Sequence, residues 1–132
     1  MLKNIFSNTK KSTISVRNNS FDFNSIRDSK EKQTDSSPKE DEFYVLYDKA
    51  FLYIDEFYAN SSFNVKALEN ASKCLVSSIE LRPSKPKPYL LLAYIYFIID
   101  NKTLSVKYMK IAEELDSSLP QIQQLRDLLN GV

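Results

Sequence analysis

The near absence of glycine is the feature that most limits what this chain can fold into. Its 132 residues include one glycine, Gly131, and neither tryptophan nor histidine. Glycine provides the backbone conformations that tight hairpins, phosphate-binding loops and nucleophile elbows require. The composition therefore argues against those motifs and favours helices. An apolar content of 42% is enough for the core of one small domain.

Charge and reactive residues argue against nucleic-acid binding and against catalysis. Lys and Arg number 18 against 17 Asp and Glu, so no net field draws the chain onto nucleic acid or an anionic membrane. The absence of histidine removes the usual general base and the commonest metal ligand. The single cysteine, Cys74, lies in an apolar helical stretch and is interpreted as a small buried hydrophobe rather than a reactive thiol. We therefore expect a non-catalytic protein with no cofactor and no metal.

Residues 1–40 form a region of different composition, which we predict to be a disordered tail. They are rich in Ser, Asn and Lys, and their isolated apolar residues follow no helical or strand period. Residues 1–21 contain Lys and Arg but no acid, as do organellar transit peptides and the starts of type III secretion substrates. A solvated basic tail is the simpler interpretation. We expect a cytoplasmic protein, with organellar import or type III secretion as alternatives.

The rest of the chain, residues 41–132, is predicted to be one helical domain. Apolar residues recur at helical spacing, and Pro38 with the acidic residues 40–42 marks the start of the first helix. The prolines at 83, 86 and 88 separate the second helix from the third. The predicted helices span 43–60, 64–81, 86–100 and 104–115, with a turn at 60–62. A short fifth helix is predicted to start at 118–120 and to stop at 130–131. The longest apolar run, 89–99, is too short to cross a bilayer.

An internal repeat appears when the chain is compared with itself at an offset of 34 residues, at which Lys73 matches Lys107. At this offset Leu81 matches Leu115 and Pro86 matches Pro120. Small and large residues also recur at the same positions, in the pairs Ala71 and Ser105, Leu75 and Met109, and Ser78 and Ala112. A period of about 34 residues over two helices is the length of a tetratricopeptide unit.

Residues of the third and fourth helices carry a resemblance to the tetratricopeptide family. They read Tyr89-x-x-Leu92-Ala93-x-x-Tyr96, followed by the small residues Ser105 and Ala112. In this pattern, small residues let paired helices approach closely while larger ones fill the gaps. Ser117 and Ala93 depart from the proline and glycine that the family often has at these positions. The resemblance covers about two repeats plus a terminal helix over residues 43–130. It is looser in the first repeat, whose helices we expect to be extended.

The resemblance implies an all-α superhelix of antiparallel helix-turn-helix repeats that binds other proteins. In such repeats the first helix of each pair lines a concave surface. The partner-binding groove predicted from the register is aromatic and apolar, and its residues are Tyr47, Phe51, Ile54, Leu90, Tyr94 and Phe97. Related domains that clamp a partner's C-terminal carboxylate have Lys and Asn at two of these positions, so an apolar helix or peptide is the better expected ligand.

Two alternatives remain open at this level. The first is that the terminal helix or the N-terminal tail covers the aromatic face, which would then be ordinary core. The second is that another copy of the chain buries the groove, so that the protein is a self-associating structural protein and a homodimer. The leading hypothesis is an adaptor or chaperone-like module that holds an apolar segment of another protein.

Overall fold

The computed structural model describes residues 21–27, 38–59 and 65–131, and in these residues it is all-helical, with no strand. Its elements are the short 3-10 helix η1 (Phe23–Ile26) and five α-helices. The α-helices are α3 (Pro38–Ala59), α4 (Val65–Leu81), α5 (Pro86–Ile98), α6 (Lys102–Leu115) and α7 (Pro120–Leu129). The prediction of an all-α fold is confirmed. The turn predicted at 60–62 lies outside the described residues.

Local sequence signals explain where the helices begin. α3 starts at Pro38, the predicted entry signal, and so before the span of 43–60 predicted from apolar spacing. Glu40 and Asp41 lie in its first turn, where acidic side chains complement the helix dipole. Proline also occupies the start of α5, at Pro86, and of α7, at Pro120. Proline suits this position because the first amide of a helix has no acceptor within the helix.

The turn between α5 and α6 takes its shape from two adjacent residues. Asp100 has a φ of 64°, and the hydrogen bonds from Asp100 N to Phe97 O and from Asn101 N to Tyr96 O close the end of α5. This pair of hydrogen bonds is a Schellman motif. The Asn101 side chain then accepts a hydrogen bond from Leu104 N and caps α6. The short turn makes α5 and α6 antiparallel neighbours.

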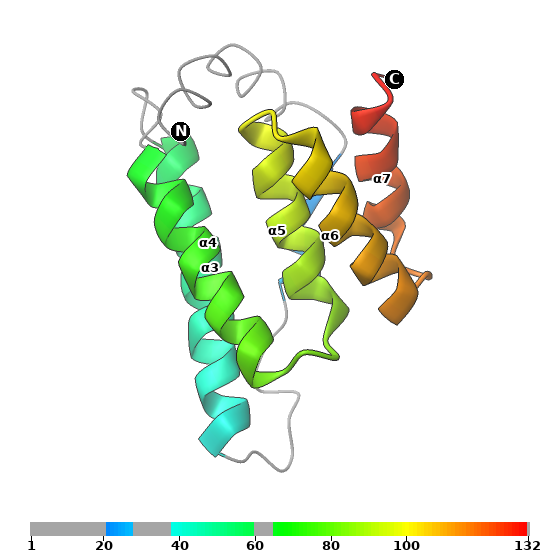
Figure 1. Ribbon diagram of the computed structural model, residues 1–132. Coiled ribbons are helices and arrows are strands. Elements are labelled where there is room, and N and C mark those ends of the chain that lie inside the picture. Colours follow the sequence, from blue (N-terminus) through cyan, green and yellow to red (C-terminus); the bar gives the residue numbers. More distant parts are fainter. Residues whose placement is uncertain (1–20, 28–37, 60–64, 132) are drawn as a thin grey trace.

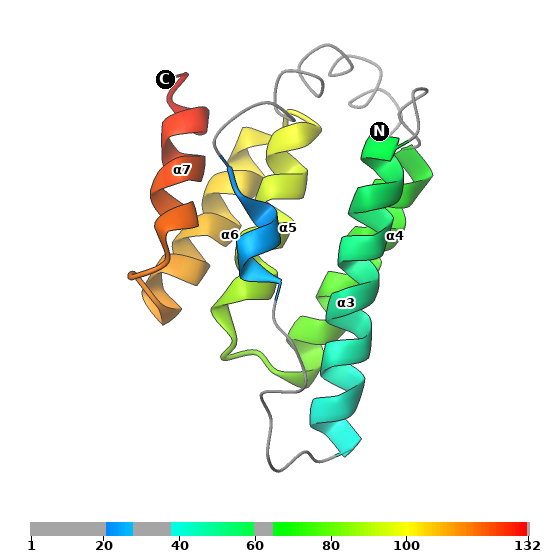
Figure 2. The ribbon, with the colours of Figure 1, turned by 180° about the vertical axis from the view of Figure 1, so that it is seen from behind.

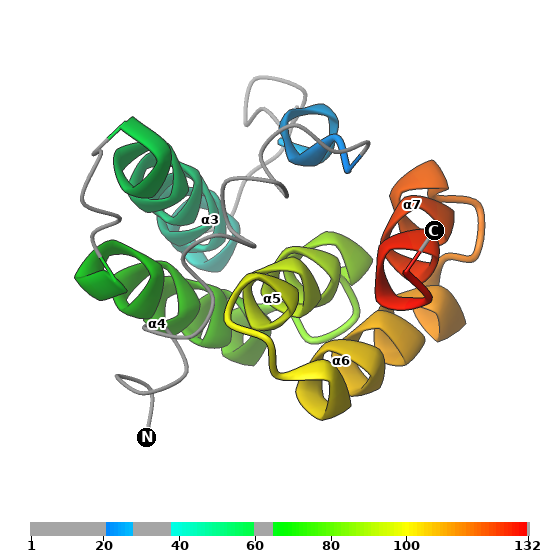
Figure 3. The same ribbon diagram turned by 90° about the horizontal axis from the view of Figure 1, so that it is seen from above.

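The helices form side-by-side pairs. α3 packs against α4, α5 packs against α6, and α4 joins the two pairs by packing against α5. α7 packs against both α5 and α6. Successive helices run in opposite directions, so α3, α5 and α7 run the same way (Figures 1 and 3). The helices of the first pair, with 22 and 17 residues, are longer than those of the second, with 13 and 14, as expected.

Positions that match at the offset of 34 residues have the same surroundings in the structure. Ala71 and Ser78 of α4 are buried, as are their counterparts Ser105 and Ala112 of α6. The matching prolines begin α5 and α7, so α7 corresponds to the first helix of a further pair. α5 and α7 thus occupy matching positions, and α3 precedes α4 in the chain as α5 precedes α6.

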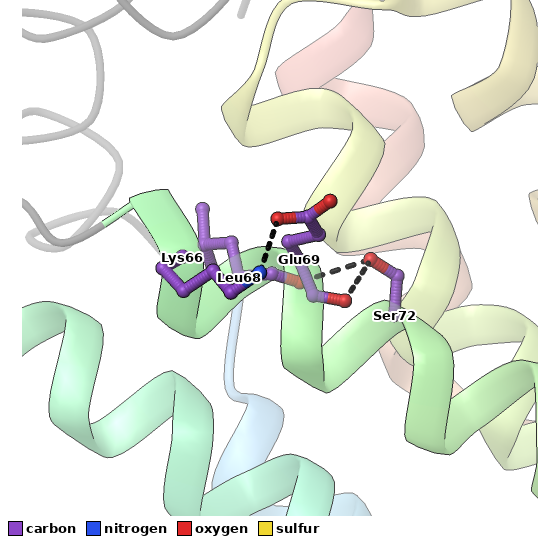
Figure 4. A network of polar contacts seen from close by, with 4 residues as sticks. All are labelled: Lys66, Leu68, Glu69 and Ser72. Carbon is purple, nitrogen blue, oxygen red and sulfur yellow. Dashed lines mark hydrogen bonds and ion pairs between the residues drawn. The ribbon is translucent and has the colours of Figure 1, made fainter. Parts of the chain in front are cut away.

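The exposed side of α4 satisfies its polar groups locally. Lys66 Nζ lies 3.4 Å from Glu69 Oε1, one turn along the helix. The Ser72 hydroxyl donates to the carbonyl oxygens of Leu68, at 2.9 Å, and Glu69, at 3.2 Å (Figure 4). These contacts stay within one helix, and such bonds from serine to the preceding turn are common in helices. This polar cluster is therefore explained by α4 alone.

The segment 21–27, which contains η1, lies on the side of the molecule formed by α3, α5 and α7. It lies between α3 and α7 and against α5 (Figures 2 and 3). Phe21 and Ile26 are buried there. Residues 21–27 of the predicted tail thus have a defined position, because two apolar side chains find a surface to bury against. Residues 38–40 belong to α3, and residues 1–20 and 28–37 lie outside the described residues.

In the described part of the chain, every helix is too short or too polar to cross a membrane.

Candidate functional site

The six residues predicted to line a groove lie on the side of α3 and α5 that faces segment 21–27. Tyr47, Phe51 and Ile54 of α3 and Leu90 and Tyr94 of α5 are at most 1% exposed, and Phe97 is half-buried; all six belong to or pack against one apolar core. The face is thus aromatic and apolar, as expected, but it is not open to solvent. Part of its cover is segment 21–27.

The aromatic end of the segment rests on α5. The Phe21 ring stacks on the Tyr94 ring, with centroids 4.2 Å apart and planes 13° from parallel. The Tyr94 hydroxyl lies 2.6 Å from the Tyr58 hydroxyl of α3, so a hydrogen bond joins α3 and α5. Burial, with a smaller contribution from Tyr58, raises the pKa of Tyr94 far above its ordinary value. The hydroxyl therefore stays protonated at neutral pH.

The aliphatic end of the segment lies against α3. Ile26 is 1% exposed, and its backbone carbonyl accepts a hydrogen bond from the Tyr47 hydroxyl. Arg27 follows, with its guanidinium carbon 4.9 Å from the centre of the Phe51 ring and its Nη1 atom 3.5 Å from Asp55 Oδ2. A cation over an aromatic face is attracted by the ring quadrupole. The ion pair is solvent-accessible, so it adds orientation more than affinity.

α7 contributes two glutamine side chains. Gln124 Oε1 accepts a hydrogen bond from the backbone amide of Asp22, at 2.9 Å, and Gln121 Nε2 donates to the Ser25 hydroxyl. Within the segment, the Ser25 amide and hydroxyl both donate to the Asp22 carbonyl, at 3.4 and 3.0 Å. These bonds close the turn on itself. α3, α5 and α7 therefore all contact the same short segment.

A pocket of about 180 Å³ lies beside the Tyr47 end of this face. It is lined by Phe43, Tyr47, Lys85, Pro86, Lys87, Pro88 and Asp116. Lys85 is committed to Glu40, with 3.6 Å between Nζ and Oε2, and Glu40 also pairs with Arg82 at 2.5 Å. These ion pairs tie the start of α3 to the turn before α5. Hydrogen bonds from Ser118 lower the pKa of Asp116. The charges around the pocket thus have structural partners, and we assign it no ligand.

Metal-ligating and nucleophilic side chains complete the description of the site. The described residues contain no group of three or more His, Cys, Asp and Glu side chains that could hold a metal ion. Burial raises the pKa of the Cys74 thiol, with Lys49 opposing this in part. A thiol with a raised pKa is a weak nucleophile at neutral pH. Cys74 packs against the core as interpreted, but it is partly buried rather than fully buried.

Sequence reasoning missed the residues that cover the face. Phe21, Ile26 and Arg27 fell inside the predicted disordered tail, and Gln121 and Gln124 of α7 were not singled out. A weak signal existed, because apolar residues at 21, 23 and 26 interrupt an otherwise polar stretch. Such spacing has no clear helical or strand period, so only the surface they meet gives them a role.

Three comparisons with known proteins were made, and the chain matches no family model, no curated protein and no solved structure. The site is therefore interpreted from its own geometry.

Proposed function

We propose that this chain is a non-catalytic protein-binding module of the tetratricopeptide type, acting as an adaptor or chaperone-like protein. The face formed by α3, α5 and α7 would hold an apolar segment of a partner protein. We propose the cytoplasm as its compartment.

One observation carries this proposal. A short segment of the chain lies across α3, α5 and α7 and buries Phe21 and Ile26 against them. The face therefore has the shape and chemistry to hold a short segment with apolar anchors. Two of its hydrogen bonds, from Tyr47 and to Gln124, reach backbone atoms of the segment, so they do not depend on the bound sequence. Peptide grooves combine main-chain bonds of this kind with pockets for a few side chains.

The repeat pattern supports the family resemblance independently. Offset-matched positions in α4 and α6 are buried alike, and the Ser105 hydroxyl donates to the Ala93 carbonyl at 2.8 Å across the α5–α6 contact. A bond from a short side chain to a neighbouring helix backbone requires the close approach that small residues permit. This is the packing expected of a tetratricopeptide pair.

Self-association remains the second candidate, because α3 exposes two large apolar residues away from the segment. Val45 is 57% exposed and Leu52 is 59% exposed, and they lie two helical turns apart on the same side of α3. Light scattering over a range of concentrations tests this candidate. A mass that doubles with concentration in the natural chain, but not in Val45→Ala/Leu52→Ala, would favour a homodimer through α3.

The binding proposal is tested by selecting peptides from a random displayed library. The bait is the full chain carrying Phe21→Ala/Ile26→Ala, which removes the anchors of the covering segment. The matched control is the full chain carrying Val45→Ala/Leu52→Ala, which removes two apolar side chains elsewhere. We expect peptides with apolar anchors to be enriched on the first variant over the second. Equal enrichment, or none, would contradict the proposal.

A further inference from the structure

The segment that covers the face makes three side-chain contacts at defined spacing. Phe21 provides a flat aromatic ring, Ile26 a branched aliphatic side chain, and Arg27 a cation. Each meets a matching surface, namely the Tyr94 ring, the apolar core beside Tyr47, and the Phe51 ring with the Asp55 carboxylate. The face thus distinguishes an aromatic position, an aliphatic position five residues later and a cationic position directly after it.

The backbone of the segment is held separately from these side chains. Gln124 accepts from the amide of Asp22 and Tyr47 donates to the carbonyl of Ile26, near the two ends of the turn. These bonds set the register of the segment on the face, because they fix one amide and one carbonyl. Any chain that adopts the same 3-10 turn can make them. The side-chain contacts then decide which sequence binds best.

We propose that residues 21–27 are an internal copy of the motif by which the partner binds. The partner presents an aromatic residue, an isoleucine-like residue five positions later and an arginine next to it, in one turn of 3-10 helix. Its segment binds by displacing residues 21–27 from α3, α5 and α7. This inference rests on the proposed function and adds the class of ligand to it.

Tethering determines how strongly the internal copy competes. The segment and α3 belong to one chain and lie close in sequence, and a short covalent connection typically gives an effective concentration of about 1 mM. If the isolated motif binds with a Kd of about 10 µM, the internal copy would weaken an added peptide by roughly 100-fold. Removing the internal anchors restores the lost affinity without touching the face itself.

The experiment measures binding of a fluorescent peptide of residues 20–30 to the full chain by anisotropy. The proteins are the natural chain, Phe21→Ala/Ile26→Ala, and the control Val45→Ala/Leu52→Ala. We expect the peptide to bind the first variant at least tenfold more tightly than the other two proteins. A second peptide, with alanine in place of both anchors, should bind none of them. A third, with Arg27→Glu, should bind the first variant more weakly than the natural sequence does.

Three results would overturn the inference. The first is no binding of the natural peptide to a folded variant at mM concentration, and the second is equal binding to all three proteins. The third concerns two variants of the full chain, Phe21→Ala/Ile26→Ala and the milder Arg27→Glu. If both lose the helical circular dichroism signal, the segment is an indispensable part of the core. If library selection still yields a different motif on the folded variant, the inference fails while the proposed function stands.

Discussion

The two sides of α5 are covered in different ways. Towards α6, small side chains allow the helices to approach closely, and Ser105 hydrogen-bonds directly to the backbone of α5. On the other side, segment 21–27 contacts α5 chiefly through the stack of Phe21 on Tyr94, and polar side chains of α3 and α7 hold its backbone. The first contact joins neighbours in sequence, whereas the second joins elements far apart in the chain. We infer that the first belongs to the cooperative core and that the second can open alone.

The largest expected effect is at the α5–α6 contact. Ser105→Leu should lower the free energy of unfolding by about 2–4 kcal/mol, because the larger side chain overpacks a buried site and a buried hydrogen bond is lost. Urea denaturation measures this loss. Lys110→Leu, which adds a leucine at an exposed position of the same helix, is the control and should change stability by less than about 0.5 kcal/mol. Equal effects of the two changes would mean that α5 and α6 are not closely packed.

Substitutions in segment 21–27 should cost less stability, because the loss cannot exceed the free energy with which the segment docks. Phe21→Ala and Ile26→Ala should each cost about 1–2 kcal/mol, and the double variant little more than the larger single loss. Either change releases the whole segment, so the second has nothing left to remove. Urea denaturation of the two single variants and the double variant measures this. Fully additive losses would place the segment in the cooperative core and remove the contrast between the two sides.

Unfolding at alkaline pH tests how completely Tyr94 is buried on the side of α5 that faces segment 21–27. The pKa of Tyr94 is raised in the folded state, mainly by burial, while an unfolded tyrosine has a pKa of about 10. The neutral hydroxyl is thus compatible with the fold below pH 10, and stability is lost as the pH rises above that value. The loss should be about 1.4 kcal/mol per pH unit for this residue. Unfolding measured from pH 9 to 11 should show a smaller slope in Tyr94→Phe than in the natural chain.

The smallest expected effect concerns the ion pair at the end of the segment. Arg27 and Asp55 are solvent-accessible, so Asp55→Asn should cost about 0–1 kcal/mol and less at high salt. The pair between Arg126 of α7 and Glu113 of α6, with 2.8 Å between Nη2 and Oε2, offers a comparison between helices. Glu113→Gln should have a similarly small cost. A loss well above 1 kcal/mol in Asp55→Asn alone would mean that Arg27 dominates the docking of the segment.

Much of the helical framework could be predicted from local signals in the sequence. Pro86 and Pro120 mark helix starts because proline has no amide to lose, and the spacing of Ala71, Leu75 and Ser78 recurs in α6 because equivalent helices pack alike. The predicted helix boundaries agree with the structure to within a few residues except at the start of α3. The aromatic character of the face formed by α3 and α5 was also predicted, since register along a helix determines which residues share a side.

Only the tertiary structure decided whether that face is open. The sequence by itself determined an all-helical chain with paired helices, because proline positions, capping residues and apolar spacing act over a few residues. It did not determine the fate of Phe21 and Ile26, whose burial depends on a surface assembled from α3, α5 and α7. Isolated apolar residues in a polar stretch have no periodic signal, so their role is decided by long-range packing. The same two side chains that weaken a prediction of disorder thus mark the face on which the proposed binding site lies.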